Sequence, residues 1–119
     1  MIKRALVLFA LMLIVPAALA QSRVPTLDDL VTLKTVGATQ ISPDGKWVAY
    51  TVSHGDFKQD AFITQIWLAN SETGKSFQLT RADKSSTAPR WSPDGQWLAF
   101  LSNRVEDKNQ IFLISPSGG

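Results

Sequence analysis

A nine-residue segment that occurs twice constrains the fold of this chain more than any other feature of its sequence. SPDGKWVAY at residues 42–50 recurs as SPDGQWLAF at residues 92–100, with six identical positions. A shorter element, QIWL at 65–68, recurs as QIFL at 110–113. The two spacings differ by five residues, which a loop can absorb at little entropic cost. The chain therefore contains a structural repeat of roughly 45 to 50 residues, the period of β-propeller blades.

Each repeat predicts a tight turn followed by short strands. In Ser-Pro-Asp-Gly, Pro fixes φ at the second position of the turn, and Asp tolerates the bridge-region backbone conformation of the third position. Gly adopts the left-handed conformation with which the chain leaves the turn. Strands are predicted after both turns, at both copies of the shorter element, and at a polar outer segment of the first repeat. Their ranges are 46–52, 96–102, 66–69, 111–114 and 76–80.

The strands after the turns carry apolar side chains on both faces. In the first of them, Trp47 and Ala49 point one way, whereas Val48, Tyr50 and Val52 point the other way. A strand buried on both sides needs a neighbour on each face. We therefore expect an all-β fold over residues 38–119, a partial β-propeller of about one and a half blades of four-stranded antiparallel sheet. The second blade is expected to be truncated, so that the chain is a piece of a longer protein.

Residues 1–20 have the three-part pattern of a secretory signal peptide. A basic start is followed by an apolar run over residues 5–15 and by an A-x-A ending at Ala18 and Ala20. The run is shorter than the roughly 20 apolar residues that span a bilayer, which argues against an anchor. We expect an exported protein, periplasmic or secreted, with no membrane attachment after cleavage. Residues 21–37 form a lead in which Thr26 and Asp29 predict the capped start of a short helix that ends near residues 34–37.

The charge balance gives no sign of a nucleic-acid partner. The chain has 12 basic and 10 acidic residues and a net charge of +2. Lys3 and Arg4 of the signal peptide account for the excess, and the other cations are scattered. Cysteine is absent, so the mature part has to be held together by apolar burial.

The residue types that carry chemistry do not form a recognisable set. There is no G-x-S-x-G motif, and His54, the only histidine, is expected in the loop after the first repeat strand as a solvated residue. One His without Cys makes a zinc site improbable. Asp44 and Asp94 allow a paired-carboxylate or calcium interpretation, but their recurrence at the same turn favours bonds to the turn backbone. We therefore assign no catalytic, cofactor-binding or metal-binding residue and expect no cofactor.

The tryptophans and one polar loop allow both a functional and a structural interpretation. Trp47, Trp67, Trp91 and Trp97 could stack on sugars or bases, but all four lie on or beside predicted strands. Packing between blades is therefore the favoured interpretation. The loop at residues 54–60 could line the mouth of a propeller, although such a loop is more often only solvated.

The repeats at residues 41–51 and 90–104 resemble the propeller repeats of the prolyl oligopeptidase family and of the translocation protein TolB. The stretch LDDLVTLKTV at residues 27–36 leads directly into the first repeat. It is similar to the start of exported acylaminoacyl-peptidase-like and dipeptidyl-peptidase-like members of that family, whereas TolB begins with a separate α/β domain. The resemblance covers about residues 27–119, nearly all of the mature chain.

The resemblance implies a function that this chain carries only in part. In the peptidase family, a propeller of seven or eight blades caps a C-terminal α/β-hydrolase domain that holds the catalytic Ser, Asp and His. By this resemblance the chain is the N-terminal propeller part of an exported serine peptidase. The hydrolase domain, absent from this chain, is expected to pack on the propeller, which gates the access of short peptides. The alternative is a periplasmic TolB-like propeller that acts as a non-catalytic protein-binding module.

We predict that the precursor is cleaved between Ala20 and Gln21, because the A-x-A ending gives signal peptidase the small side chains it needs. N-terminal sequencing of the exported protein should start at Gln21. Recovery of an integral membrane protein that still begins at Met1 would contradict this prediction.

Overall fold

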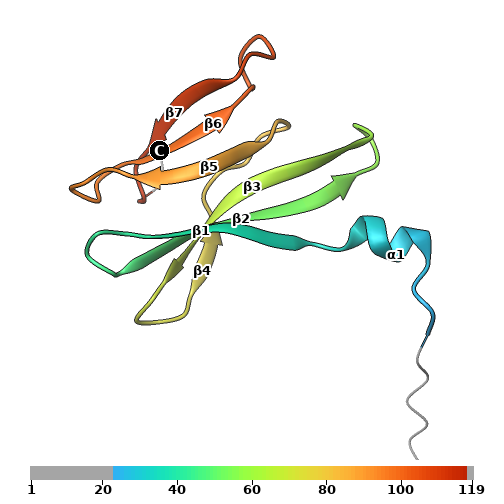
Figure 1. Ribbon diagram of the computed structural model, residues 1–119, viewed down its shortest axis with the longest axis horizontal. Coiled ribbons are helices and arrows are strands. Elements are labelled where there is room, and N and C mark those ends of the chain that lie inside the picture. The colour runs from blue at the N-terminus through green and yellow to red at the C-terminus, as the bar shows by residue number, and fades with distance from the viewer. Residues whose placement is uncertain (1–22, 118–119) are drawn as a thin grey trace, which may run out of the picture.

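The computed structural model describes residues 23–117, so the predicted signal peptide and its cleavage site lie outside the described residues. The elements are α1 (Leu27–Thr32), β1 (Thr35–Ile41), β2 (Trp47–Asp56), β3 (Ala61–Asn70), β4 (Ser76–Gln78), β5 (Ser86–Trp91), β6 (Leu98–Ser102) and β7 (Gln110–Ile114). Sheet 1 has the strand order β1-β2-β3-β4 and sheet 2 the order β5-β6-β7, and all pairs are antiparallel (Figure 1). The fold is the expected all-β partial propeller, with one blade of four strands and a second blade of which three strands are described.

The two Ser-Pro-Asp-Gly turns have the same backbone. Gly45 N donates to Ser42 O, and Gly95 N donates to Ser92 O, both at 2.9 Å. The two glycines have φ values of 72° and 70°, the left-handed exit that the sequence predicts.

A bulge in the first strand of each sheet repeats as well. The pairing shifts between Gly37 and Gln40 in β1 and between Thr87 and Arg90 in β5. Ala38 and Ala88, inside the two bulges, have φ values of 40° and 51°, which is uncommon for residues other than glycine. β1 starts inside the lead assigned to residues 21–37, so the first strand begins earlier than the assigned blade boundary.

The hairpin of β2 and β3 is longer than the sequence predicts. The two strands pair over ten positions, from Trp47 with Asn70 to Asp56 with Ala61, whereas β6 and β7 pair over five. The expectation that His54 lies in a loop is therefore wrong. His54 is part of β2 and pairs with Ile63 of β3. The extra residues of the first repeat lengthen the hairpin because a ladder satisfies backbone groups that a loop leaves to water.

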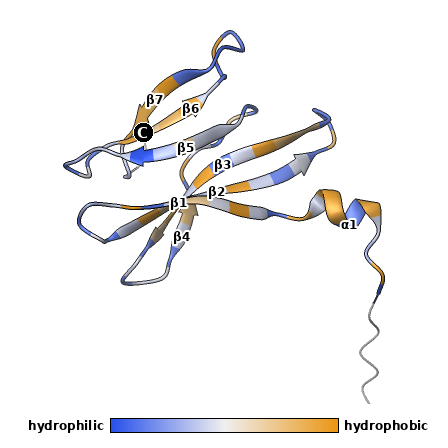
Figure 2. Ribbon diagram, in the orientation of Figure 1, coloured by the Kyte–Doolittle hydropathy of each residue, from blue (hydrophilic) through white to orange (hydrophobic). Residues whose placement is uncertain are grey.

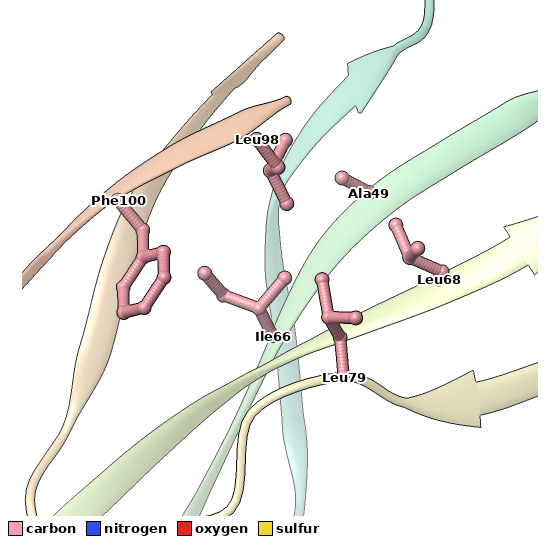
Figure 3. Packing of buried hydrophobic residues seen from close by; sticks show 6 residues of the cluster. All are labelled: Ala49, Ile66, Leu68, Leu79, Leu98 and Phe100. Atoms are coloured by element: carbon pink, nitrogen blue, oxygen red, sulfur yellow. The ribbon is translucent and has the colours of Figure 1, made fainter. Parts of the chain in front are cut away.

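The core lies between the two sheets. Its cluster consists of Ala49, Ile66, Leu68, Leu79, Leu98 and Phe100 (Figure 3). Ile66 and Leu68 project from β3, and Leu98 and Phe100 project from β6; none of the four is more than 3% exposed. Burying an aliphatic or aromatic side chain is worth about 1.5–3 kcal/mol. This layer is therefore the main interaction that holds the sheets together.

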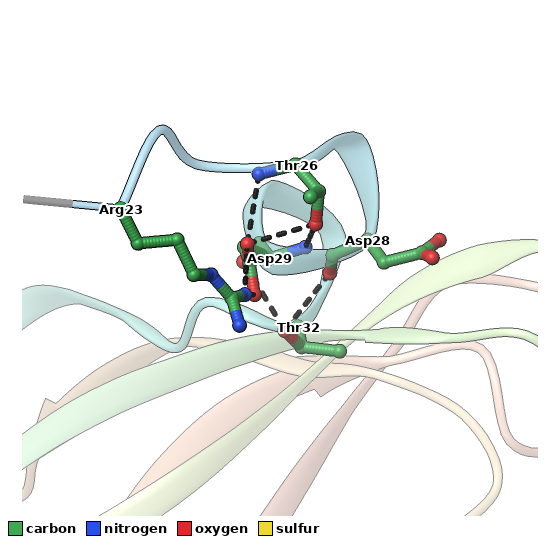
Figure 4. A network of polar contacts seen from close by, with 5 residues as sticks. All are labelled: Arg23, Thr26, Asp28, Asp29 and Thr32. Carbon is green, nitrogen blue, oxygen red and sulfur yellow. Dashed lines mark hydrogen bonds and ion pairs between the residues drawn. The ribbon is translucent and has the colours of Figure 1, made fainter.

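The helix α1 begins with the predicted cap. Thr26 Oγ1 accepts from Asp29 N at 3.3 Å, and Asp29 Oδ2 accepts from Thr26 N at 2.8 Å (Figure 4). The backbone bond from Thr26 and the ion pair with Arg23 lower the pKa of Asp29. The helix ends at Thr32, earlier than expected. No helix within residues 23–117 is long and apolar enough to cross a membrane.

Gly55 of β2 sets how closely the helix approaches sheet 1. A Cβ at this position would lie 2.6 Å from the Val31 carbonyl oxygen and 2.7 Å from Val31 Cγ1. Both distances are well below van der Waals contact distances. The carbonyl oxygen is a backbone atom, so a change of side-chain rotamer cannot relieve this clash. The hairpin therefore accepts α1 only because this residue has no side chain.

The turn aspartates are held as carboxylates by a repeated hydrogen-bond chain. Asp44 Oδ1 accepts from Ser42 Oγ at 2.6 Å and from Lys46 N at 3.0 Å, and Ser42 Oγ accepts from Trp47 N at 3.0 Å. Asp94 makes the equivalent bonds to Ser92 and to Gln96 N. The serine hydroxyl first, and then the backbone N–H, lower the pKa of each aspartate below its ordinary value of 3.8.

We predict that Gly55→Ala displaces α1 and costs about 1–3 kcal/mol of unfolding free energy, because the new methyl group overpacks the contact with Val31. Trypsin should then cleave after Lys34 faster than in the parent chain. Gly37→Ala is the matched control, since its Cβ would meet only Thr51 Oγ1 at 3.4 Å. Equal cleavage rates in the two variants would show that α1 does not depend on Gly55.

We predict that the turn aspartates stabilise the fold at neutral pH and lose this effect in acid. A carboxylate whose pKa is lower in the folded state stabilises it fully above the unfolded value of 3.8. The stabilisation disappears as the pH falls through the lower, folded value. Asp44→Asn and Asp94→Asn should therefore lower Tm at pH 7, and the difference from the parent chain should close as the pH falls below 3.8.

Asp28→Asn is the control for this series, because among the described residues the Asp28 carboxylate accepts no hydrogen bond. Its Tm should follow that of the parent chain at every pH. A Tm difference for Asp44→Asn that stays constant from pH 7 to strong acid would contradict the carboxylate's role.

Candidate functional site

A polar hollow of about 380 Å³ lies at one end of sheet 1, where the β2–β3 turn approaches the connection between β4 and β5. Its lining residues are His54, Asp56, Gln59, Ile63, Gln65, Gln78, Arg81, Ala82 and Asp83. Two carboxylates, a guanidinium group and the only imidazole of the chain therefore border one recess.

Gln65 forms the fixed floor of the hollow. It is 3% exposed, and its Nε2 donates to Ala82 O at 2.8 Å and to Lys84 O at 3.2 Å. Its Oε1 accepts from Thr80 Oγ1 at 2.7 Å, and Thr80 Oγ1 in turn accepts from Ile66 N at 2.9 Å. These bonds tie the β4–β5 connection to β3, so the shape of the hollow is set by the sheet.

The rim of the hollow carries the charged groups. Asp56 ends β2, and its Oδ1 accepts from Lys58 N at 2.8 Å and from Gln59 N at 3.2 Å, so this carboxylate holds the turn. Arg81 and Asp83 are exposed on the opposite rim, and His54 is half-buried. The hollow can therefore bind a polar group through both charge and hydrogen bonds.

The hollow does not contain a nucleophile with its base. Within residues 23–117, His54 makes no hydrogen bond to a hydroxyl or carboxylate, which a triad needs. In the same part of the chain, no three His, Cys, Asp or Glu side chains come together in a way that could hold a metal ion. Asp44 and Asp94 lie at separate turns and do not form a pair.

Two of the four tryptophans pack between the two sheets as expected. Trp47 and Trp91 pack against the core, and Trp91 Nε1 donates to Gln40 O at 3.1 Å, which bonds sheet 2 to sheet 1. Trp67 stacks on Tyr50 with ring centroids 6.5 Å apart. Trp97 is 48% exposed on the face of sheet 2 that is turned away from sheet 1, so the packing between blades that is expected for it stays a prediction.

The sequence pattern predicts only some of the residues that border the hollow. The loop interpretation of residues 54–60 identifies His54, Asp56 and Gln59, which do border the hollow. Arg81 and Asp83 come from a connection with no pattern of its own, and only its packing on β3 brings them there. The glutamine that recurs at positions 65 and 110 is the one signal that could have pointed to this floor.

Comparison with known proteins supports the peptidase resemblance. No family model matches the chain. It is 40% identical over 94 residues to a Bacillus subtilis protein named as the uncharacterized peptidase YuxL, an alignment that covers 79% of this chain. It is 32% identical over 99 residues, 83% of the chain, to dipeptidyl-peptidase 5 of Porphyromonas endodontalis. The chain spans 14% of the length of each of these two relatives.

A solved propeller structure agrees with the fold. The structure, assigned to TolB of Agrobacterium tumefaciens, superposes with a TM-score of 0.55 and 28% sequence identity. The superposition covers 74% of this chain and 29% of the TolB chain. The relatives and the two antiparallel sheets together identify the family of this sequence. The chain belongs to the prolyl oligopeptidase family, and its described strands are blades of the propeller of that family.

Proposed function

We propose that this chain is the N-terminal propeller part of an exported serine peptidase, and that the propeller restricts a C-terminal α/β-hydrolase domain to short peptides. The observation that carries the proposal is the match of 79% and 83% of the chain to proteins named as peptidases. The sequence pattern of residues 1–20 supports export. Hydrolysis itself is assigned to the hydrolase domain, since no described residue forms a nucleophile–base pair.

Gating requires blades that do not slip past one another. The apolar layer between β3 and β6 and the bond from Trp91 to Gln40 fix sheet 2 on sheet 1. A wall built in this way excludes large substrates for as long as its blades stay in contact. In this proposal the size limit of the peptidase is a property of the blade interfaces.

The helix α1 offers a surface for the hydrolase domain. It projects beyond sheet 1 (Figure 1), and Leu27, Leu30 and Leu33 are 77%, 56% and 59% exposed. Apolar side chains at this density on a six-residue helix are better covered than left in water. We assign this surface to the contact with the hydrolase domain.

A second candidate function is a TolB-like propeller that binds a protein without catalysis, which the TolB superposition favours. The protein expressed from its complete coding sequence decides between the two. A peptidase should release p-nitroaniline from dipeptidyl substrates and should be inactivated by a fluorophosphonate. Absence of any hydrolysis, together with stable binding of an envelope protein, would favour the second function.

We predict that loosening the blade interface relaxes the size limit. In the complete protein, Trp91→Phe removes the hydrogen bond to Gln40 and keeps most of the ring, a loss of about 0.5–1.5 kcal/mol. The ratio of kcat/KM for a long unstructured peptide to that for a dipeptidyl substrate should rise roughly two- to tenfold. Trp47→Phe makes the same change at a ring that also packs on the core but whose Nε1 donates to no described residue, so it should change the ratio less. A ratio that stays constant in both variants would contradict gating by the blades.

A further inference from the structure

An aspartate followed by a glycine occurs twice in the chain, once in each Ser-Pro-Asp-Gly turn, as Asp44-Gly45 and Asp94-Gly95. This dipeptide favours a reaction between the aspartate side chain and the backbone, because glycine has no side chain that blocks access to its nitrogen. Both turns lie at the same end of the two sheets (Figure 1). Residues 43–46 of the first turn are exposed and largely hydrophilic (Figure 2). Burial therefore does not protect this bond from water.

The reaction converts the aspartate to isoaspartate in two steps. The glycine nitrogen attacks the carbon of the protonated side-chain carboxyl group, and a five-membered succinimide closes. The amide proton and the carboxyl hydroxyl leave together as water. A water molecule then adds to one of the two ring carbonyl groups. Addition at the backbone carbonyl leaves a chain that runs through the former side chain, with one extra methylene group and an unchanged mass.

Each turn binds the glycine nitrogen that would have to react. Gly45 N donates to Ser42 O, and Gly95 N donates to Ser92 O, both at 2.9 Å. An N–H group that donates to a carbonyl retains its proton and keeps a fixed direction. Closure of the succinimide therefore requires that the turn first opens.

Each turn also binds the carboxylate. Asp44 Oδ1 accepts from Ser42 Oγ at 2.6 Å and from Lys46 N at 3.0 Å, and Asp94 Oδ1 accepts the equivalent two bonds. The rotation that brings the carboxyl carbon to the glycine nitrogen breaks these bonds. The serine hydroxyl, followed by the backbone N–H, also lowers the pKa of each aspartate, so that less of the reactive protonated form exists at neutral pH.

The two turns differ in one brace. Ser71 of the β3–β4 turn donates from its Oγ to Gly45 O at 2.7 Å and from its N to Lys46 O at 2.9 Å. The equivalent residue of the second repeat, 45 positions further along the chain, is Pro116. Proline has neither a hydroxyl group nor an N–H, so it can donate neither bond. The first turn is therefore held by more hydrogen bonds than the second.

We propose that Asp44-Gly45 and Asp94-Gly95 are sites of isoaspartate formation that the turn hydrogen bonds keep closed, and that Asp94-Gly95 is modified first. Isoaspartate cannot rebuild the turn, because the extra methylene group moves the carboxylate away from the serine. Each event therefore leaves one blade turn open for the lifetime of the molecule. This chemistry holds whether or not the longer protein is a peptidase.

The experiment follows both sites in the protein expressed from its complete coding sequence, incubated at neutral pH over weeks. Trypsin separates the sites, because peptide 35–46 contains Asp44 and peptide 91–104 contains Asp94. An isoaspartate peptide has the mass of its parent, elutes separately and resists endoproteinase Asp-N. Synthetic peptides of the same sequences give the rates without a turn. Both sites in the protein should react at least about tenfold more slowly than in the peptides.

The two sites should also differ from one another. Relative to its peptide, Asp94 should react roughly two- to tenfold faster than Asp44, the effect of about one hydrogen bond. Ser71→Ala removes that bond at an exposed position and should raise the rate at Asp44 by a similar factor. The rate at Asp94 should stay unchanged in this variant.

Ser42→Ala and Ser92→Ala form a matched pair, because each removes the hydroxyl group from one turn and leaves the other turn intact. Ser42→Ala should raise the rate at Asp44 alone, and Ser92→Ala the rate at Asp94 alone, each by roughly two- to tenfold. Loss of the whole fold would raise both rates in one variant, so the unchanged site reports that the blade is folded. If Ser42→Ala unfolds the protein, Ser71→Ala still tests the first turn.

Three results would overturn the proposal. The first is a rate in the protein equal to that in the peptides, which would show that the turns give no protection. The second is a rate at Asp44 that exceeds the rate at Asp94 when each is compared with its peptide. The third is a set of folded serine variants in which neither site reacts faster than in the parent protein.

Discussion

Ile66 and Leu68 of one sheet share a buried apolar layer with Leu98 and Phe100 of the other, and the arrangement of the molecule depends on that contact. A sheet of three or four short strands has two faces and gains stability only from the faces that it covers. Each sheet here buries apolar side chains against the other sheet, and its opposite face has exposed apolar side chains, Val36 and Ile41 in sheet 1 and Ile111 and Leu113 in sheet 2. The repeat, the bulges and the turns are therefore features of a unit that is built to have neighbours on both sides.

The parts of the fold that could be predicted from the sequence are those set by local chemistry. The Ser-Pro-Asp-Gly turns, the strands that follow them and the capping box at Thr26 each depend on residues close together in the chain. β1 and β5 are not predictable in this way, because a bulge at Ala38 and Ala88 interrupts the alternation of their side chains. The length of the β2–β3 hairpin is also not predictable from the sequence, because the five extra residues can form a loop or extend the paired strands equally well.

The site is predictable only in part, for a similar reason. His54 and its neighbours lie on one hairpin, so their proximity follows from the chain itself. Arg81 and Asp83 reach the hollow because Gln65 bonds the backbone of their connection, and that contact is tertiary. Trp97 shows the same limit: its turn is equivalent to that of Trp47, but its environment depends on what covers the open face of sheet 2.

The most direct test of this account is the orientation of sheet 2 against sheet 1, because a shift of one residue would exchange its covered and open faces. Nuclear Overhauser effects from the Ile66 methyl groups in a methyl-labelled sample measure it. The structure predicts contacts from Ile66 to the Leu98 methyl groups and the Phe100 ring protons. Contacts from Ile66 to the methyl groups of Ile111 or Leu113 would contradict it.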